Sequence, residues 1–296
     1  MTEGTVEDDI GTFFGLDGID IGNAPIAFPR GIMLRKTYAY LMQPAIMAFA
    51  PAAPGCHHPG PWKETRGGGG RTISTELFIP RSAAPEKGDR IGLAHTIILL
   101  LKLWVHPGVE LVVGSNMAFA DIPHAKDAAA ILLHPPMRQR HFQLMPVSSD
   151  GIPDALAWTS EHFEIAQNLM ESSSEFRLAA SALDAGQSYQ ETALAMVSLW
   201  GSLEAIFSPS TGELRFRVSA LIAAYLYPPG SERLKHQRRI AKLYDMRSAA
   251  AHGKPRHSAD DLLQTFELVR AVLISFIRKG HVPSREEFEA NLFGAQ

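Results

Sequence analysis

Arg247 and His252 are the two side chains whose types and spacing best suit chemistry on a phosphodiester. An arginine can hold a phosphate through two parallel hydrogen bonds, and a histidine can move protons near neutral pH. RNA brings its own nucleophile, the 2′-hydroxyl. We therefore expect the pair to support metal-independent cleavage, with His252 as general acid or base and Arg247 stabilising the developing charge.

The geometry of this pair depends on how the helix that carries it ends. Arg247 shares an apolar stripe with Ile240 and Leu243, where a charged group needs a partner or a ligand. In an unbroken helix, five residues turn the side chains about 140° apart. Either the helix ends just before His252, as Gly253 indicates, or the working site combines two subunits.

Neighbouring polar residues could support the pair. Ser248 follows Arg247 directly, and its hydroxyl can hydrogen-bond a phosphate. Glu204 lies beside an apolar stripe, so it either pairs with Arg247 and orients it or is an ordinary exposed glutamate. We interpret Tyr244 as a core residue and Asp245 as a surface residue. Arg90 and His95 repeat the same spacing elsewhere, and we interpret them as a helix-edge residue and a core histidine.

Charge is strongly segregated along the chain. Residues 213–257 contain ten Lys or Arg and three acidic residues, a net charge of +7, while the whole chain has −3 and the remainder therefore −10. A local basic surface attracts phosphate backbones, although a solvated helix face explains the charges equally well. The candidates for RNA binding are Arg238, Arg239, Lys242 and Lys254.

We predict an α+β fold for the chain that positions these residues. At 296 residues, with 46% apolar and 20% charged residues, the chain favours two globular domains, residues 1–150 and 151–296. The first is frequently interrupted by Gly and Pro, which predicts a strand-rich mixed domain with a strand over residues 73–80 and one buried helix near 91–105.

The second domain shows helical periodicity throughout. We predict helices over residues 155–170, capped by Asp154, and over 173–186, 188–207 and 212–227. Three more follow over 231–252, capped by Ser231, over 259–278 and over 285–293. Short loops between long helices predict an antiparallel bundle.

Other motifs carry less weight. Cys56, His57 and His58 lack a second ligand cluster downstream, so a surface loop is favoured over a metal site. Glycines 67–70 lie between Arg66 and Arg71 and could cradle a phosphate, but a hairpin loop is favoured because no P-loop residues follow. Arg138, Arg140 and His141 form a small basic patch without a clear partner. No metal and no cofactor are expected.

The stretches SLWGSLEAIF, ELRFRVSALIAAYL and RRIAKLYDMRSAAAHG resemble the ApeA-like branch of the HEPN superfamily, over about residues 190–280. The resemblance implies a bundle of four or five helices that dimerises through the helix carrying Arg247 and His252. It also implies metal-independent endoribonuclease activity with that pair as the active site, often in prokaryotic phage defence or toxin systems. Active members often place Asn, Asp or His where this chain has Ser248. The matching residues are Glu204, Glu213, Arg217, Tyr244, Arg247, Ser248, His252 and Gly253.

These observations lead to one expected function and two alternatives. We expect a cytoplasmic endoribonuclease whose partners are RNA, with tRNA as one candidate, and a second copy of the chain. The first domain would sense a trigger or select the target. The alternatives are a non-catalytic dimerisation or nucleotide-binding scaffold, and an N-terminal enzyme with the bundle as its dimerisation platform. The acidic start, the single Cys56 and the shortness of the apolar run 91–105 favour the cytoplasm over export or a membrane.

Overall fold

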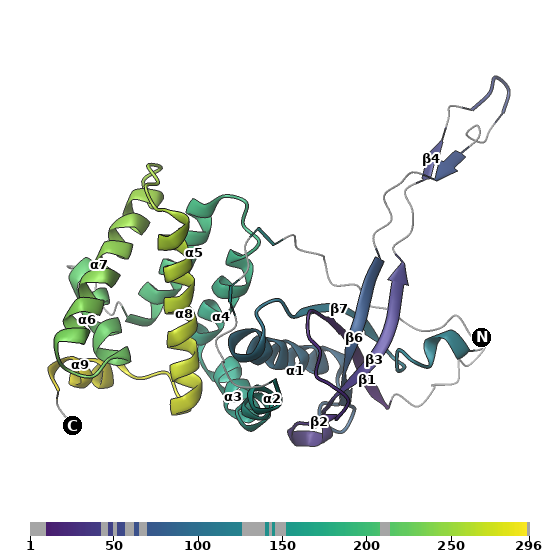
Figure 1. The fold of residues 1–296 in the computed structure, drawn as a ribbon, viewed down its shortest axis with the longest axis horizontal. Helices are drawn as coiled ribbons and strands as arrows, with labels where there is room; N and C mark the ends of the chain where they lie inside the picture. The colour runs from purple at the N-terminus through teal and green to yellow at the C-terminus, as the bar shows by residue number, and fades with distance from the viewer. Residues whose placement is uncertain are drawn as a thin grey trace. The chain divides into compact units, whose positions relative to one another are not determined.

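A computed structural model describes residues 10–42, 47–49, 52–56, 62–64, 70–125, 140–141, 144–145, 152–207 and 214–294. Within these residues a β-sheet forms in the N-terminal part and helices follow in the C-terminal part, which confirms the predicted α+β class (Figure 1). The chain divides into two compact units, residues 1–94 with 109–135, and residues 95–108 with 136–296.

The first unit is built on a five-stranded antiparallel sheet in the order β2-β3-β6-β1-β7. The predicted strand over residues 73–80 lies within β6. Strand β1, which lies between β6 and β7, is buried along most of its length, with Phe14 and Leu16 in the core. The strands of this sheet are β1 Gly11–Asp17, β2 Ile26–Ala27, β3 Met33–Met42, β6 Gly70–Pro80 and β7 Glu110–Ser115; β4 Met47–Phe49 and β5 Trp62–Glu64 pair separately.

The second unit consists of helices whose buried stripes match the sequence pattern. The predicted apolar residues of α5, including Met196 and Leu203, and of α8, including Phe266 and Val269, are all buried. The helices are α2 Ile152–Glu161, α3 Phe163–Ser172, α4 Ser174–Gly186, α5 Thr192–Phe207, α6 Leu214–Leu226, α7 Ser231–Ala251, α8 Ala259–Lys279 and α9 Arg285–Phe293. Figure 1 shows α5, α6, α7 and α8 gathered in one bundle.

The predictions of one continuous helix over residues 155–170 and of two helix caps are wrong. The helix predicted over residues 155–170 is two helices, because His162 leaves the helical conformation between α2 and α3. Since α2 starts at Ile152, Asp154 lies in its first turn and is not the cap. Ser231 likewise lies inside α7, and the capping position is Gly230, which has no side chain to make the capping hydrogen bond.

One helix contributes to both units. Helix α1, Lys87–Leu100, continues into a π-helical turn, Leu101–Val105, and the division falls between Ala94 and His95. Residues 95–108 therefore group with the helical unit, whereas the sequence placed them in the strand-rich domain. The reason is packing: Trp104 stacks on Trp158 of α2, with ring centroids 4.7 Å apart, and Thr96 donates to Gln167 of α3 at 2.7 Å.

The first turn of α1 is held by a buried arginine. Arg90 is 2% exposed and donates to the Thr12 hydroxyl at 2.8 Å and to the Ala84 and Pro85 carbonyls at 3.0 and 2.7 Å. Its interpretation as a helix-edge residue is therefore wrong. His95, interpreted as a core histidine, is exposed, because Leu93 and Ile97 face the core and His95 lies on the other side of the helix.

We predict that Arg90→Ala lowers the free energy of unfolding by about 2–4 kcal/mol, since two buried acceptors and a partly buried one lose a charged donor. Urea denaturation measures the change. Lys87→Ala, an exposed position in the same helical turn, is the control and should stay within about 0.5 kcal/mol of the wild type. Equal effects of the two substitutions would contradict a structural role for Arg90.

Candidate functional site at the C-terminal end of helix α7

Arg247 is held by a carboxylate from the neighbouring helix. Its Nη2 donates to Oε2 of Glu204, on α5, at 2.6 Å, and the two side chains are only 23% and 18% exposed. The pairing that the sequence left open is therefore made. It explains how a permanent charge occupies the apolar side of α7, because a buried charge is tolerated when it is paired.

Tyr244 completes this cluster. It is buried, as predicted, with its ring edge-on to Trp200 at a centroid distance of 5.2 Å, and the Arg247 guanidinium carbon lies 5.6 Å from its ring centroid. Its hydroxyl donates to Oε1 of Glu204 at 2.8 Å, a contact that we did not predict. Burial, with the hydrogen bond and charge of Glu204, raises the pKa of Tyr244 to about 12, so the phenol remains a donor at neutral pH.

The cluster contains two buried donors without an acceptor. Arg247 Nε and Trp200 Nε1 have no hydrogen-bond partner among the residues that the structure describes. Both side chains contact the ring of Tyr244. Buried donors normally find an acceptor, so these two are unsatisfied positions within the described part of the cluster.

His252 lies just past the last residue of α7. It occupies the capping position, its N–H donates to the Ser248 carbonyl at 3.2 Å, and its side chain is exposed. Gly253 follows with φ of 72°, a left-handed conformation that favours glycine and ends the helix as predicted. The imidazole makes no side-chain hydrogen bond with any described residue, which leaves it available to a ligand.

The two residues of the pair do not meet within one copy of the chain. Because α7 remains helical as far as Ala251, the side chains of Arg247 and His252 leave the helix about 140° apart. Arg247 faces α5, whereas His252 faces solvent. Ser248, next to Arg247, is half-buried. The helix does end just before His252, the first of the two arrangements that the sequence left open, but the imidazole remains on the solvent side.

The predicted RNA-binding residues are all exposed, but they lie on different sides of α7. Arg238 and Lys242 leave the helix about 180° and 140° from Arg247, on the solvent side. Arg239 is directed toward α8, where it donates to Gln264 at 2.8 Å. Arg238 and Lys254 form no side-chain hydrogen bond or ion pair with any described residue. The solvent face of α7 is therefore basic, while Arg247 points away from it.

One other acid near the pair has a structural partner. Asp245, predicted to be a surface residue, accepts both Nε and Nη2 of Arg215 on α6 at 2.6 and 2.8 Å. Glu213, the first residue of the motif shared with Arg217, lies outside the described residues.

The minor motifs remain without a site. Cys56 is exposed, and His57, His58, Arg66, residues 67–69 and Arg138 lie outside the described residues. Arg71 pairs with Asp17 and Glu110, and Arg140 donates to the Pro107 carbonyl at 2.7 Å. Within the described ranges, no group of three His, Cys, Asp or Glu side chains could hold a metal ion. The described helices include none that is long and apolar enough to cross a membrane.

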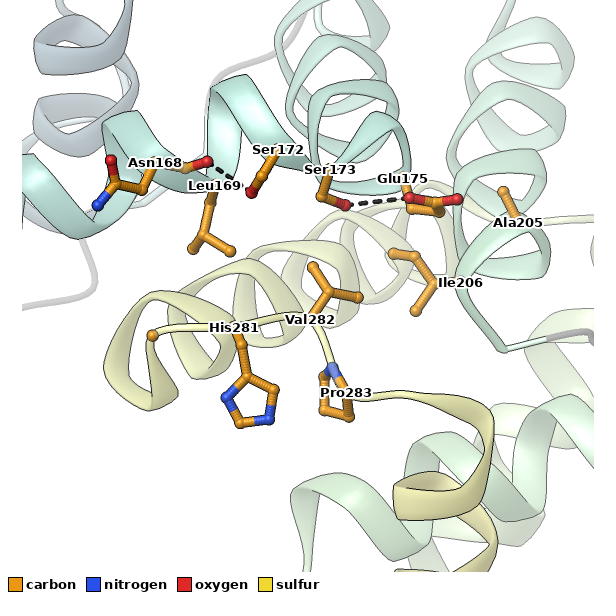
Figure 2. Close-up of a pocket in the computed structure, with 11 residues that line it drawn as sticks. Asn168, Leu169, Ser172, Ser173, Glu175, Ala205, Ile206, His281, Val282 and Pro283 are labelled. Carbon is orange, nitrogen blue, oxygen red and sulfur yellow. Dashed lines mark hydrogen bonds between the residues drawn. The ribbon is translucent and has the colours of Figure 1, made fainter.

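A separate hollow of about 470 Å³ lies in the helical unit, between the α3–α4 junction and the turn before α9 (Figure 2). Leu169, Ile206 and Val282 form its apolar part, and the polar lining includes Ser172 and Glu175. None of the residues singled out from sequence lines it. Its polar groups bond to their own helices, as Ser173 does to Glu175 at 3.1 Å, so it does not compete with α7 as the candidate site.

Comparison with protein-family models, with curated proteins and with solved structures finds no match to this chain.

We predict that Glu204→Ala lowers the free energy of unfolding by about 2–3 kcal/mol, because it leaves the partly buried Arg247 charge without its partner. The double variant Glu204→Ala/Arg247→Met should regain most of that loss, and chemical denaturation of the four proteins of the cycle measures it. Strictly additive effects would contradict the ion pair.

We predict that Tyr244→Phe makes stability less dependent on pH above pH 10. In the wild type the folded pKa of Tyr244 is raised from 10.0 to about 12, so its contribution is complete below pH 10 and is lost as pH rises toward 12. Tyr225, whose pKa burial also raises to about 12, keeps part of the dependence in the variant. Urea unfolding between pH 9 and 12 measures the slope, and identical slopes would contradict the prediction.

Proposed function

We propose that the C-terminal unit is a HEPN-type helical module and that the protein is a metal-independent endoribonuclease. The observation that carries the proposal is the way Arg247 is held. A carboxylate at 2.6 Å, itself held by Tyr244, orients the guanidinium at one end of α7, where His252 is exposed and available. An oriented cation and a free imidazole are the two groups that cleavage by the 2′-hydroxyl needs.

The reaction follows from the chemistry of RNA. The 2′-oxygen attacks the adjacent phosphorus, and the bond from phosphorus to the 5′-oxygen breaks. This leaves a 2′,3′-cyclic phosphate and a free 5′-hydroxyl. His252 accepts the proton of the 2′-hydroxyl or donates one to the 5′-oxygen, and Arg247 stabilises the negative charge on the phosphate oxygens.

A dimer along α7 would complete the site. Arg247 lies on α7 and His252 follows its last residue, with their side chains about 140° apart, and an isologous pairing of two copies would place the His252 of one copy beside the Arg247 of the other. The small side chains of Ser248 and Ala251 leave room for close approach of a second helix. We propose this dimer together with the activity.

The wider setting is proposed on the resemblance to the HEPN superfamily. The protein would act in the cytoplasm, in prokaryotic phage defence or a toxin system, on RNA of which tRNA is one candidate. The N-terminal unit would sense a trigger or select the target. The basic solvent face of α7, with Arg238, Lys242 and Lys254, supports RNA as the partner.

A second candidate function is a non-catalytic scaffold or nucleotide-binding module. One observation favours it: Glu204 neutralises the charge of Arg247, and the Arg247 Nε atom is buried. In this case the ion pair would stabilise the packing of α5 on α7, and His252 would contribute to a binding surface without moving protons.

We predict that the wild type cleaves total cellular RNA in EDTA and that Arg247→Ala and His252→Ala each lower the rate at least about 100-fold. Gel electrophoresis measures the cleavage rate, and mass spectrometry identifies the cyclic phosphate ends. Arg285→Ala and His281→Ala, at exposed positions on and before α9, are matched controls and should cleave like the wild type.

Size-exclusion chromatography with light scattering accompanies the assay. Folded dimeric variants that have lost cleavage would support catalysis. Cleavage that survives both substitutions would exclude the pair as the active site. Loss of dimerisation by both variants, without cleavage by the wild type, would favour the scaffold.

A further inference from the structure

Phe216 is an exposed aromatic residue at the start of an otherwise buried helix. It lies in the first turn of α6 with 63% of its surface exposed, while all eight residues from Val218 to Tyr225 are buried. Arg215 and Arg217 flank it in the sequence. A large aromatic side chain in solvent between two arginines has no role in the core, which raises the question of what it contacts.

The first turn of α6 is fastened to α7 close to the candidate site. Arg215 donates twice to Asp245, at 2.6 and 2.8 Å, and Asp245 is two residues before Arg247. Further along, Gln237 donates to Ser219 at 2.9 Å, so α6 and α7 run antiparallel. The start of α6 therefore lies against the C-terminal part of α7, and Phe216 belongs to the same end of the bundle as His252.

The surroundings of Phe216 are suited to nucleic acid. The solvent face of α7 carries Arg238 and Lys242, and Lys254 follows its end. Cationic side chains bind the phosphate backbone, and an exposed aromatic ring binds the face of an unpaired base. A ring on a turn that a double hydrogen bond holds in place also loses little freedom on binding. Duplex RNA hides its base faces, so the combination selects single-stranded segments.

We propose that Phe216 stacks on an unpaired base of RNA bound along the basic solvent face of α7, and so directs the site to single-stranded RNA. This inference rests on the proposed function, because it assumes that RNA is the partner. It adds a residue outside the Arg247 and His252 pair that contacts the base and not the phosphate.

Binding can be measured apart from cleavage with a short fluorescein-labelled 2′-O-methyl oligoadenylate, which has no free 2′-hydroxyl to attack. Fluorescence anisotropy of the full-length protein then gives the Kd. We expect Phe216→Ala to weaken binding about 5- to 150-fold and Phe216→Tyr to change it by less than about threefold. Phe293→Ala, which removes another exposed aromatic side chain, on α9 (82% exposed), is the matched control and should bind like the wild type.

The salt dependence separates stacking from charge. Because Phe216 would contact no phosphate, the slope of log Kd against log salt should be the same in the wild type and in Phe216→Ala. A blunt-ended 2′-O-methyl duplex with the same label should bind more weakly than the single strand and should be insensitive to the substitution. A changed salt slope, or an equal loss on the duplex, would overturn the assignment.

The remaining outcomes also decide between the claims. Equal single-strand binding by wild type and Phe216→Ala, with normal cleavage of cellular RNA, would overturn this inference and leave the proposed function intact. Single-strand binding that depends on Phe216, without any cleavage, would uphold the inference and count against catalysis. If the wild type is a dimer and the Phe216→Ala variant is a monomer, a second copy covers this residue, and the inference is overturned. Failure of the wild type to bind either oligonucleotide would overturn both.

Discussion

The ion pair between Arg247 and Glu204 is the contact on which the arrangement of the α5–α7 interface depends. A guanidinium is costly to move out of water, and α7 directs this one toward α5 and not toward solvent. The carboxylate of Glu204 offsets that cost and in turn needs donors for both of its oxygens. Arg247 supplies one and Tyr244 the other, at 2.6 and 2.8 Å. Packing of Trp200 against Tyr244 closes the cluster.

The pairing with Glu204 has two opposite effects on Arg247. The carboxylate holds the guanidinium in one geometry, which favours catalysis or binding, but it also neutralises the positive charge that would attract a phosphate. Among the residues that the structure describes, Nε of Arg247 and Nε1 of Trp200 have no acceptor, so the hydrogen bonds of the cluster are not all made there. Orientation favours phosphate binding only if a phosphate oxygen can accept a hydrogen bond from these donors while Glu204 stays paired with Arg247. The competing proposals, ribonuclease and scaffold, differ on this point.

Helix α7 therefore presents two chemically different faces. One faces α5 and holds Arg247, and the other faces solvent and is basic. The Arg215–Asp245 pair at the edge of the second face anchors the start of α6 there. A single copy keeps Arg247 and the exposed His252 on separate sides of the end of α7. Buried polar groups also join distant elements in the first unit. Arg90 donates a hydrogen bond to Thr12, and Glu76 accepts hydrogen bonds from the Arg35 side chain and from the Phe119 N–H.

The sequence alone determined most of the helices of the second unit and the strand in β6. Periodic apolar residues set the helices, and local signals set their ends. Gly253 ends α7, and the capping boxes at Ser258 and Ser284 start α8 and α9; each acts on the backbone within a few residues. Only the tertiary structure decided that Arg90 is buried, that residues 95–108 join the helical unit, and that Arg247 pairs with Glu204. Those outcomes depend on which distant element packs against each residue, and the partner of Arg247 lies 43 residues away. No local pattern can select such a partner, because burial and pairing of a charge are set by the packed neighbours and not by its own helix.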